Sequence, residues 1–356
     1  MSKNLSGEAQ ARAVKRSTVT LRDVASEAGV GLGTASRAMD PTSQYVATEV
    51  RARVLEVADR LGYRPNSSAR ATTTGSAPTI AMLVSDIRDP YNAQLVHGAI
   101  DKARAAGLMV TITGADDVTG DEVRTIRLLR GQRPRALVLT STRTGSWSSS
   151  SRLLRELESY ERDGGRVVVA GDDDLPFDTA VVPRHEGAYL LATTLRDLGY
   201  RSLGLIRPAE DAPDVRAWER GLLQGARAAG VRVVQPHRGP EVARTRDGGF
   251  AATAAFLSDG PTDVDGLVVA NDTMALGTLR ALRAAGLEPG RDIGVAGFGD
   301  VVDADDVTPG LTSVDLSLEA VGGAAVELAL RTAVPERRRV EFVARTVVRD
   351  STPPRI

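Results

Sequence analysis

Apolar positions between residues 19 and 39 recur at the spacing of two short helices joined by a turn. The first helix carries its apolar residues on one face, and these are Leu21, Val24, Ala25 and Ala28. Thr20 stands just before this face and Asp23 follows three residues later, an acidic variant of the capping box that satisfies free backbone N–H groups. Gly29 supplies the turn, and a second helix is expected over about 32–39. A third helix is expected over about 48–61.

Beyond Thr79 the pattern changes to short apolar runs that alternate with longer amphipathic segments. The runs predict β-strands over residues 80–84, 109–113, 136–140, 167–170, 203–206, 266–269 and 293–298. The segments between them predict helices, among them 92–106, 152–162, 187–198, 216–229 and 273–285. This alternation favours parallel, doubly wound sheets, which bind ligands at the carboxyl ends of their strands.

The expected second helix has the side chains of a DNA-recognition helix. Thr34 and Ser36 carry hydroxyls that can contact phosphates, while Arg37 can hold the O6 and N7 atoms of a guanine. The alternative for Arg37 is a phosphate contact or a solvated charge. We therefore predict a helix-turn-helix that binds double-stranded DNA.

Composition narrows the class of protein further. The chain has 356 residues, enough for two or three domains, and no cysteine, which excludes disulfides and thiolate metal sites. Residues 1–75 hold 11 Lys and Arg against 7 Asp and Glu, a net of +4, and the remainder holds 34 against 39, a net of −5. A basic head on an acidic body fits binding to DNA. Because no apolar run approaches the roughly 18 residues of a membrane span, we expect a cytoplasmic, nucleoid-associated protein without membrane contact.

Several separated motifs resemble the LacI/GalR, or lac-repressor-like, family of transcriptional regulators. The similarity covers nearly the whole sequence from Val19, in the family's order and spacing. The motifs are TLRDVASEAGV with TASRAM in the head, LGYRPNSSAR (61–70), IAMLVSDIRDPY (80–91), LVVANDTMALG (267–277), GVAGFGD (294–300), TPGLTSV (308–314) and VVRDST (347–352).

The resemblance implies an N-terminal all-α helix-turn-helix head, joined by a hinge to an α/β body like the periplasmic binding proteins, with two doubly wound parallel-sheet lobes. The expected divisions are a disordered arm (1–17), the DNA-binding domain (18–64), a hinge and linker (65–78) and an effector-binding and dimerisation domain (79–356). Within that domain the N-lobe is expected at about 79–170 and 308–334, and the C-lobe at about 171–307 and 335–356. A small-molecule effector is expected in the cleft between the lobes.

The family's DNA contacts carry over to this chain residue by residue. The expected phosphate contacts are Thr20, Thr34, Ser36, Tyr63 and Asn66, with Arg37 and Leu32 reading bases and Ala69 matching the hinge. Three positions depart from the family. Gly31 replaces a capping Ser, Gly33 offers no side chain to a base, and Thr72 replaces the Leu that wedges between base pairs. Hinge function is therefore in question.

The expected effector contacts are Tyr91, Trp218, Asn271, Phe298 and Asp300. Three usual polar groups of the family are lost, because Trp218 replaces an Arg, Gly299 an Asp and Leu316 a polar residue. One interpretation is a cleft for a ligand with a flat or apolar face that stacks on Trp218: a sugar, a glycoside or an aromatic metabolite. The other is a cleft that has lost its ligand. We expect simple monosaccharides to bind poorly.

The main hypothesis is a homodimeric transcriptional regulator, expected to be a repressor, that binds a pseudo-palindromic operator. The alternative is a ligand-binding sensor whose DNA-binding head is weakened or vestigial. An enzyme is not expected, because no catalytic constellation is present. No cofactor or metal is expected either, since His97, His185 and His237 lack the spacing of metal ligands.

Overall fold

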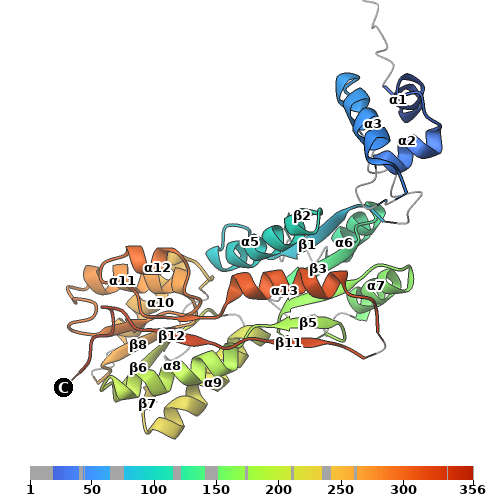
Figure 1. The fold of residues 1–356 in the computed structure, drawn as a ribbon. Coiled ribbons are helices and arrows are strands. Elements are labelled where there is room, and N and C mark those ends of the chain that lie inside the picture. The colour runs from blue at the N-terminus through green and yellow to red at the C-terminus, as the bar shows by residue number, and fades with distance from the viewer. Residues whose placement is uncertain are drawn as a thin grey trace, which may run out of the picture. The chain divides into compact units, whose positions relative to one another are not determined.

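The computed structural model describes residues 19–39, 43, 45–64, 76–114, 122–140, 151–172, 175–209, 212–234, 242–259, 263–334 and 336–355. The chain divides into two compact units, Met1–Thr73 and Thr74–Ile356, which we call the head and the body (Figure 1). The arm (1–17) and most of the hinge and linker (65–75) lie outside the described residues.

The head is a bundle of three helices, α1 (Leu21–Glu27), α2 (Leu32–Ala38) and α3 (Thr48–Arg60). The expected capping box is present: the backbone N–H of Thr20 donates to Asp23 at 2.8 Å, and that of Asp23 donates to the Thr20 hydroxyl at 3.4 Å. Gly29 takes the left-handed conformation that the turn requires, with φ of 65°. The core of the head consists of small apolar side chains from all three helices: Val24, Ala25, Ala28, Ala35, Ala38, Val54, Val57 and Ala58.

The N-lobe of the body is built on a six-stranded parallel sheet in the order β11-β5-β4-β3-β1-β2. Its strands are β1 (Thr79–Val84), β2 (Met109–Gly114), β3 (Ala136–Thr140), β4 (Val167–Gly171), β5 (Asp178–Val181) and β11 (Arg339–Glu341). Its helices are α5 (Pro90–Ala105), α6 (Glu122–Gly131), α7 (Ser151–Arg162) and α13 (Leu318–Leu330).

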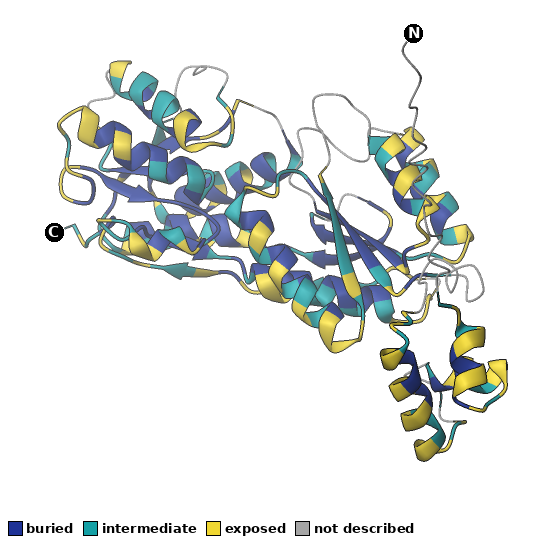
Figure 2. Ribbon diagram, turned by 90° about the horizontal axis from the view of Figure 1, so that it is seen from above, coloured by how far each residue is buried: buried dark blue, intermediate teal, exposed yellow. Residues whose placement is uncertain are grey.

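Both faces of this sheet are covered, because successive side chains of a strand point to opposite faces. Ile80, Met82 and Val84 of β1 lie in one core cluster with residues of α5 and α13. Ala81 and Leu83 lie in a second cluster with residues of α6 and α7. Figure 2 shows the result: buried strands between helices whose outer faces are exposed.

The C-lobe has a four-stranded parallel sheet in the order β7-β6-β8-β9. Its strands are β6 (Ser202–Ile206), β7 (Arg232–Val234), β8 (Gly266–Val269) and β9 (Gly294–Ala296). Its helices are α8 (Arg184–Asp197), α9 (Pro213–Ala229), α10 (Arg246–Ser258), α11 (Asp272–Ala284) and the short α12 (Asp303–Asp306). The expected doubly wound, two-lobed architecture is therefore confirmed.

The chain crosses between the lobes after β5, through β10 (Ser313–Asp315) and through β12 (Arg345–Val347), and the last two strands pair antiparallel. The expected lobe boundaries need correction, because β5 and β11 belong to the N-lobe sheet although both were assigned to the C-lobe. Each is only three or four residues long and carries charged residues, so neither has the apolar run that marks the other strands.

The buried carboxylate of Asp272, the first residue of α11, joins three segments that meet beside the crossing strand β10. It accepts hydrogen bonds from the Ser313 hydroxyl on β10 at 2.6 Å and from the backbone N–H of Val301 at 2.9 Å. Gly297 packs so closely against it that a Cβ there would lie 2.0 Å from an Asp272 oxygen. Burial raises the pKa of Asp272 to about 6, despite the hydrogen bond from Ser313. The carboxylate thus fixes the start of α11 to the crossover.

Helices α5 and α13 approach each other at a pair of glycines. A Cβ on Gly98 would lie 1.9 Å from the carbonyl oxygen of Glu319, and a Cβ on Gly322 would lie 1.9 Å from that of Leu95. Neither position can therefore carry a side chain at the present helix separation. The neighbouring Gly323 is different, because a Cβ there would lie 3.6 Å from the Gly98 carbonyl oxygen, an ordinary contact.

Two adjacent substitutions are expected to have opposite effects on stability. Gly322→Ala forces α5 and α13 apart and should lower the free energy of unfolding by about 1–3 kcal/mol. Gly323→Ala keeps the packing and should raise it by up to about 1 kcal/mol, because alanine loses less backbone entropy in a helix. Urea denaturation followed by circular dichroism measures both. Equal effects of the two variants would contradict the close helix crossing.

Asp272 should make the body less stable as pH rises. Because its pKa is raised from 3.8 to about 6, the folded state holds a proton in this window that the unfolded state has released. The free energy of unfolding should therefore fall between pH 4 and 6, by about 1.4 kcal/mol per pH unit from this group.

Chemical denaturation at several pH values tests this, and the Asp272→Asn variant should lose that component of the slope. Asp86→Asn is the control, since Asp86 has a pKa lowered by hydrogen bonds from Arg88 and should not titrate between pH 4 and 6. An unchanged slope in Asp272→Asn would show that the carboxylate is not protonated in this window.

Candidate functional site

The first candidate site is the outward face of α2 in the head. Ala35 and Ala38 are fully buried and fix α2 against the head core. The opposite face is exposed and carries Leu32, Gly33, Ser36 and Arg37. Leu32 is 47% exposed, which is unusual for a leucine on a helix packed in a small domain. The core thus directs the expected base-contacting residues to solvent.

The expected DNA contacts differ in how the head holds them. Gly31 is the N-cap of α2 and makes no side-chain hydrogen bond, as the sequence led us to expect. Arg37 folds back along its own helix, where its Nε donates to the carbonyl oxygen of Gly33 at 3.1 Å. Thr20 is exposed at the start of α1, whereas Thr34 and Tyr63 are half-buried. Asn66, Ala69 and Thr72 of the expected hinge lie outside the described residues.

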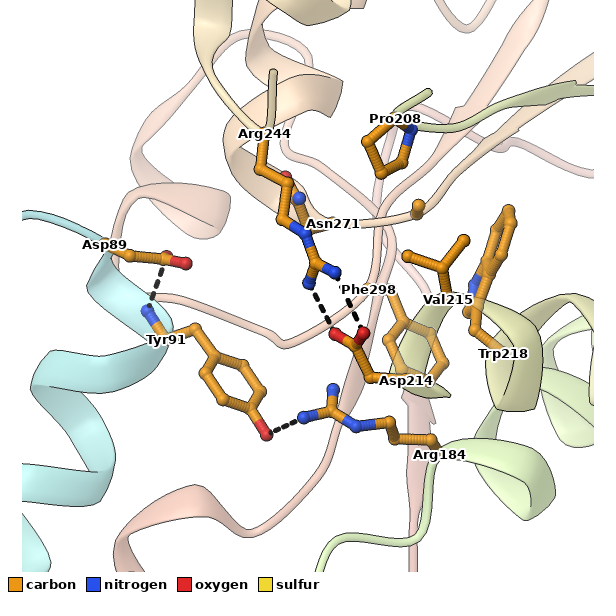
Figure 3. Close-up of a pocket in the computed structure, with 11 residues that line it drawn as sticks. Asp89, Tyr91, Arg184, Pro208, Asp214, Val215, Trp218, Arg244, Asn271 and Phe298 are labelled. Atoms are coloured by element: carbon orange, nitrogen blue, oxygen red, sulfur yellow. Dashed lines mark hydrogen bonds and ion pairs between the residues drawn. The ribbon is translucent and has the colours of Figure 1, made fainter. Parts of the chain in front are cut away.

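The second candidate site is a pocket between the two lobes of the body, shown in Figure 3. The cavity itself holds about 30 Å³, so side chains nearly fill the cleft in this structure. The N-lobe contributes the start of α5, and the C-lobe contributes residues at the carboxyl ends of its strands and along α9. The lining residues are Asp89, Tyr91, Arg184, Pro208, Asp214, Val215, Trp218, Arg244, Ala270, Asn271 and Phe298.

Trp218 and Phe298 give this pocket an apolar wall on the C-lobe side. Trp218 is only 2% exposed, and its indole Nε1 is buried without a hydrogen-bond partner among the described residues. A buried, unsatisfied donor costs free energy, roughly 1–3 kcal/mol, unless it finds an acceptor. The indole ring lines the pocket, while its Nε1 is enclosed by protein atoms.

The polar side of the pocket contains two arginines and an aspartate that sequence reasoning missed. Arg244 holds Asp214 through both of its terminal nitrogens, one of them at 2.8 Å. Burial by itself raises the pKa of Asp214, but the hydrogen bonds and charge of Arg244 outweigh burial and hold the pKa below its ordinary value. The cleft therefore retains strong polar groups although an arginine is missing at position 218.

Arg184 connects the two lobes at the back of the pocket. Its Nη2 donates to the hydroxyl of Tyr91 at 2.6 Å, and its Nε donates to Asp172 at 3.1 Å. The guanidinium also lies over the Tyr91 ring, 4.9 Å from the ring centre. Since Tyr91 belongs to α5 and Arg184 to α8, this contact spans the cleft.

Asp89 and Asn271 cap the two helices whose first turns face the pocket. Asp89 accepts the backbone N–H of Tyr91 at 3.1 Å, and Asn271 accepts that of Met274 at 2.7 Å. Each cap uses one oxygen of the side chain. The second carboxylate oxygen of Asp89 and the amide nitrogen of Asn271 have no hydrogen-bond partner among the described residues.

One expected effector contact lies elsewhere. Asp300 does not line the pocket; its carboxylate pairs with Arg349 at 2.7 Å, and its backbone takes the left-handed conformation with φ of 48°. Leu316 is fully buried in the core of the body. Tyr91, Trp218, Asn271 and Phe298 are brought together as expected.

The missed residues had a weak signal in the sequence. Arg184 opens a helix that follows β5, a strand that was not expected, and Arg244 precedes α10, a helix that was not expected either. Asp214 lies in the first turn of α9, which begins three residues earlier than its apolar pattern suggested. In each case an element or its first residue was not predicted, so the sequence did not indicate that the residue would line the pocket.

Two negative findings hold for the described ranges. No group of three or more His, Cys, Asp or Glu side chains is placed to hold a metal ion. No helix there is long and apolar enough to cross a membrane.

Comparisons with known proteins match both the head and the body of the chain. The family model for bacterial regulatory proteins of the lacI family matches residues 20–66, and that for a periplasmic binding protein-like domain matches residues 192–352. The chain is 30% identical over 317 residues to the transcriptional regulator CelR of Thermobifida fusca, which covers 86% of this chain and 90% of the relative.

Solved structures of similar proteins share the fold. A CelR–cellobiose complex matches 94% of this chain and 99% of its own, with a TM-score of 0.65 and 26% identity. The lac repressor dimer bound to operator and the anti-inducer ONPF matches the same shares, with a TM-score of 0.76 and 24% identity. The family, fold and function class expected from the sequence are confirmed. The chain belongs to the LacI family of DNA-binding transcriptional regulators, with a periplasmic-binding-protein-like domain for an effector, and it is not an enzyme.

Proposed function

We propose that this regulator is a homodimeric repressor whose affinity for a pseudo-palindromic operator changes when a small molecule binds between its lobes. The observation that supports the proposal is a pocket whose walls come from both lobes. A ligand that contacts both lobes binds their closed arrangement more tightly than their open one, and can therefore shift the balance between the two. The repressor acts in the cytoplasm, on the nucleoid.

The head supports specific DNA binding rather than a vestigial role. Its capping box and packed core are intact, and α2 presents Leu32, Ser36 and Arg37 on one exposed face. We assign Arg37 to a base edge, Leu32 to a thymine methyl group, and Thr20, Thr34, Ser36 and Tyr63 to phosphates. Asn66 and Ala69 belong to the hinge in this proposal.

A second copy of the chain is the proposed partner in the dimer. A surface groove on the C-lobe carries both signs of charge, since Arg280 and Arg283 of α11 and Asp303 and Asp306 of α12 line it. A patch with both signs can complement itself across a two-fold axis. Two linked heads then bind two half-sites with a gain in effective concentration.

The effector class proposed is a sugar, a glycoside or an aromatic metabolite with one flat or apolar face. Trp218 and Phe298 supply the surface for that face. Asn271, Asp89 and the Arg244–Asp214 pair supply polar contacts on the other side. We assign Tyr91 to the same site, with its hydroxyl held toward Arg184. The lobes already touch through this bond, and Gln94 donates to the Asp300 carbonyl oxygen at 3.2 Å.

Replacing Arg37 should weaken operator binding selectively. Arg37→Ala should cost about 1–3 kcal/mol on the specific site and much less on unrelated DNA, because only the specific site offers a guanine edge. Fluorescence anisotropy against DNA from upstream of the chain's own gene measures this. Sedimentation of the complex should give two chains per operator.

The matched control is Arg60→Ala, which removes the same charge from the head. Arg60 pairs with Glu27 at 2.8 Å and lies on α3, away from the exposed face of α2. It should weaken specific and unrelated DNA equally and slightly. Sequence-independent binding of the unmodified protein, or a monomer at micromolar concentration, would contradict the proposal.

An effector should change thermal stability and operator affinity together. A thermal-shift screen of sugars, glycosides, nucleosides and aromatic metabolites is followed by operator titration with each hit. Tyr91→Phe removes the hydroxyl that joins the lobes and should reduce this coupling, since the buried Arg184 loses a partner.

Tyr160→Phe is its control, because the Tyr160 hydroxyl donates to the Pro134 carbonyl oxygen within the N-lobe alone. Coupling should survive in that variant. If no hit changes operator affinity, the effector part of the proposal fails. If neutral hexoses at modest concentration raise stability and change operator affinity, the expectation of poor monosaccharide binding is wrong.

A further inference from the structure

One edge of the N-lobe sheet is basic, although the body as a whole is acidic. All strands of a parallel sheet begin at the same edge, so the helix ends and connections that lead into them gather there, opposite the edge where the strands end. We call these segments the entry edge. They are the last turns of α5, α6, α7 and α13, the connections that follow them and the first residue of each strand, which together comprise 76–79, 102–109, 128–136, 159–167, 178, 327–334 and 336–339.

The entry edge holds 11 Lys and Arg against 5 Asp and Glu. Three further acids pair with its arginines from neighbouring segments, and these are Asp101, Glu156 and Glu341. With all three included the count is 11 against 8, a net of +3, in a part of the chain (76–356) whose own net is −5. Positive charge is thus concentrated at one edge of an acidic body.

Arg133 and Arg135 are the best placed of these cations to bind a partner. Both are exposed, and neither side chain makes an ion pair among the described residues. Pro134 between them is buried, and its carbonyl oxygen accepts the hydroxyl of Tyr160 at 2.6 Å. The backbone beneath the two arginines is therefore fixed, while their guanidinium groups remain in solvent.

The same two residues hold the segment that arrives from the head. The backbone N–H of Ala77 donates to the carbonyl oxygen of Arg133 at 2.7 Å, and the N–H of Arg135 donates to that of Thr79 at 2.8 Å. Only the 11 residues 65–75 separate this segment from the described head, and they span at most about 40 Å when fully extended. DNA bound by the head is therefore tethered to the body beside these arginines.

The fold does not require a side chain at position 133. Arg133 has a φ of 52°, in the left-handed region that favours glycine. A glycine would hold this turn without the strain that an L side chain brings. The strained conformation therefore presents a cation that the turn itself does not need.

Like charges also crowd at the start of β11, where Arg337, Arg338 and Arg339 are consecutive. Burial and the charge of Arg339 lower the pKa of Arg337. The carboxylate of Asp178 is shared between two guanidinium groups, with Arg166 at 2.6 Å and Arg338 at 3.7 Å. Cations gathered in this way gain free energy from a polyanion.

We propose that the entry edge is a second DNA-binding surface, which contacts the phosphate backbone without reading the sequence. The inference rests on the proposed function, since it adds a contact to the same complex with DNA. Duplex DNA carries one negative charge per roughly 1.7 Å of its axis, and the guanidinium fork of arginine matches phosphate geometry. An acidic protein would match the sign of the charge, but double-stranded DNA is the polyanion that the head brings to this edge.

The dependence of DNA affinity on salt tests the proposal. Fluorescence anisotropy with the full chain measures binding to operator DNA and to an unrelated duplex between about 50 and 200 mM salt. In the Arg133→Gln/Arg135→Gln double variant, the slope of log affinity against log salt should become shallower by about 0.9 for each lost phosphate contact, about 1.8 in all. Both duplexes should show this change, so the ratio of their affinities should stay the same.

The matched control is the Arg220→Gln/Arg227→Gln double variant. Both arginines lie on α9 in the C-lobe, are exposed and make no ion pair among the described residues. The control removes the same charge from the body and should keep the slope of the unmodified protein. An equal loss in the control overturns the proposal, because net charge rather than the entry edge would then be responsible.

Arg133→Gly separates DNA contact from folding. Glycine relieves the left-handed backbone, so the melting temperature should not fall, while the slope should become shallower by about 0.9. An unchanged slope in the Arg133→Gln/Arg135→Gln variant overturns the proposal and points to an acidic protein as the partner of this edge. A loss confined to the operator also overturns it, because a phosphate contact does not distinguish sequences.

The unrelated duplex separates this proposal from the one on which it rests. If the unmodified protein shows no preference for any operator, the regulator proposal fails, while the slopes on unrelated DNA still decide whether the entry edge binds phosphates. If operator binding is specific and the slopes do not differ, the regulator stands and only the second surface fails.

Discussion

The parallel direction of the strands in both lobes is the constraint on which the cleft depends. Parallel strands end at one edge of their sheet, so the segments that follow them gather there. Pro208 follows β6, Asn271 follows β8 and Phe298 follows β9, and all three line one pocket. The capping residues of α5 and α11, Asp89 and Asn271, line the same pocket. The binding chemistry is thus a consequence of sheet topology before any individual side chain is considered.

The cleft has ion pairs on one side and an apolar wall, made by Trp218 and Phe298, on the other. Each arginine is held by a carboxylate, which fixes its orientation. Position 218 lacks the arginine expected from the family. Arg184, at the start of α8, and Arg244, just before α10, bring guanidinium groups to the pocket instead. The loss of one contact therefore did not empty the site of polar groups.

Sequence patterns predicted the elements with continuous apolar runs and missed those without them. The strand at 136–140 was expected with its observed ends, since all five of its residues are apolar or small and buried. β5 and β11 were missed because they are short and partly charged, and their sheet pairing comes only from tertiary contacts. At the site, Trp218 and Asn271 followed from the family resemblance. Asp300 did not, because a left-handed backbone turn cannot be inferred from residue type there.

The three crossings of the chain also bear on how the protein is made. The N-lobe is incomplete without α13 and β11, and the C-lobe is held by its final residues, where Tyr200 donates to the Pro353 carbonyl oxygen and the Arg355 N–H donates to that of Leu198. Neither lobe can close its core while residues beyond 318 are still unsynthesised. On the ribosome only the head has all of its own parts early, so the body can complete its cores only after its last strands emerge.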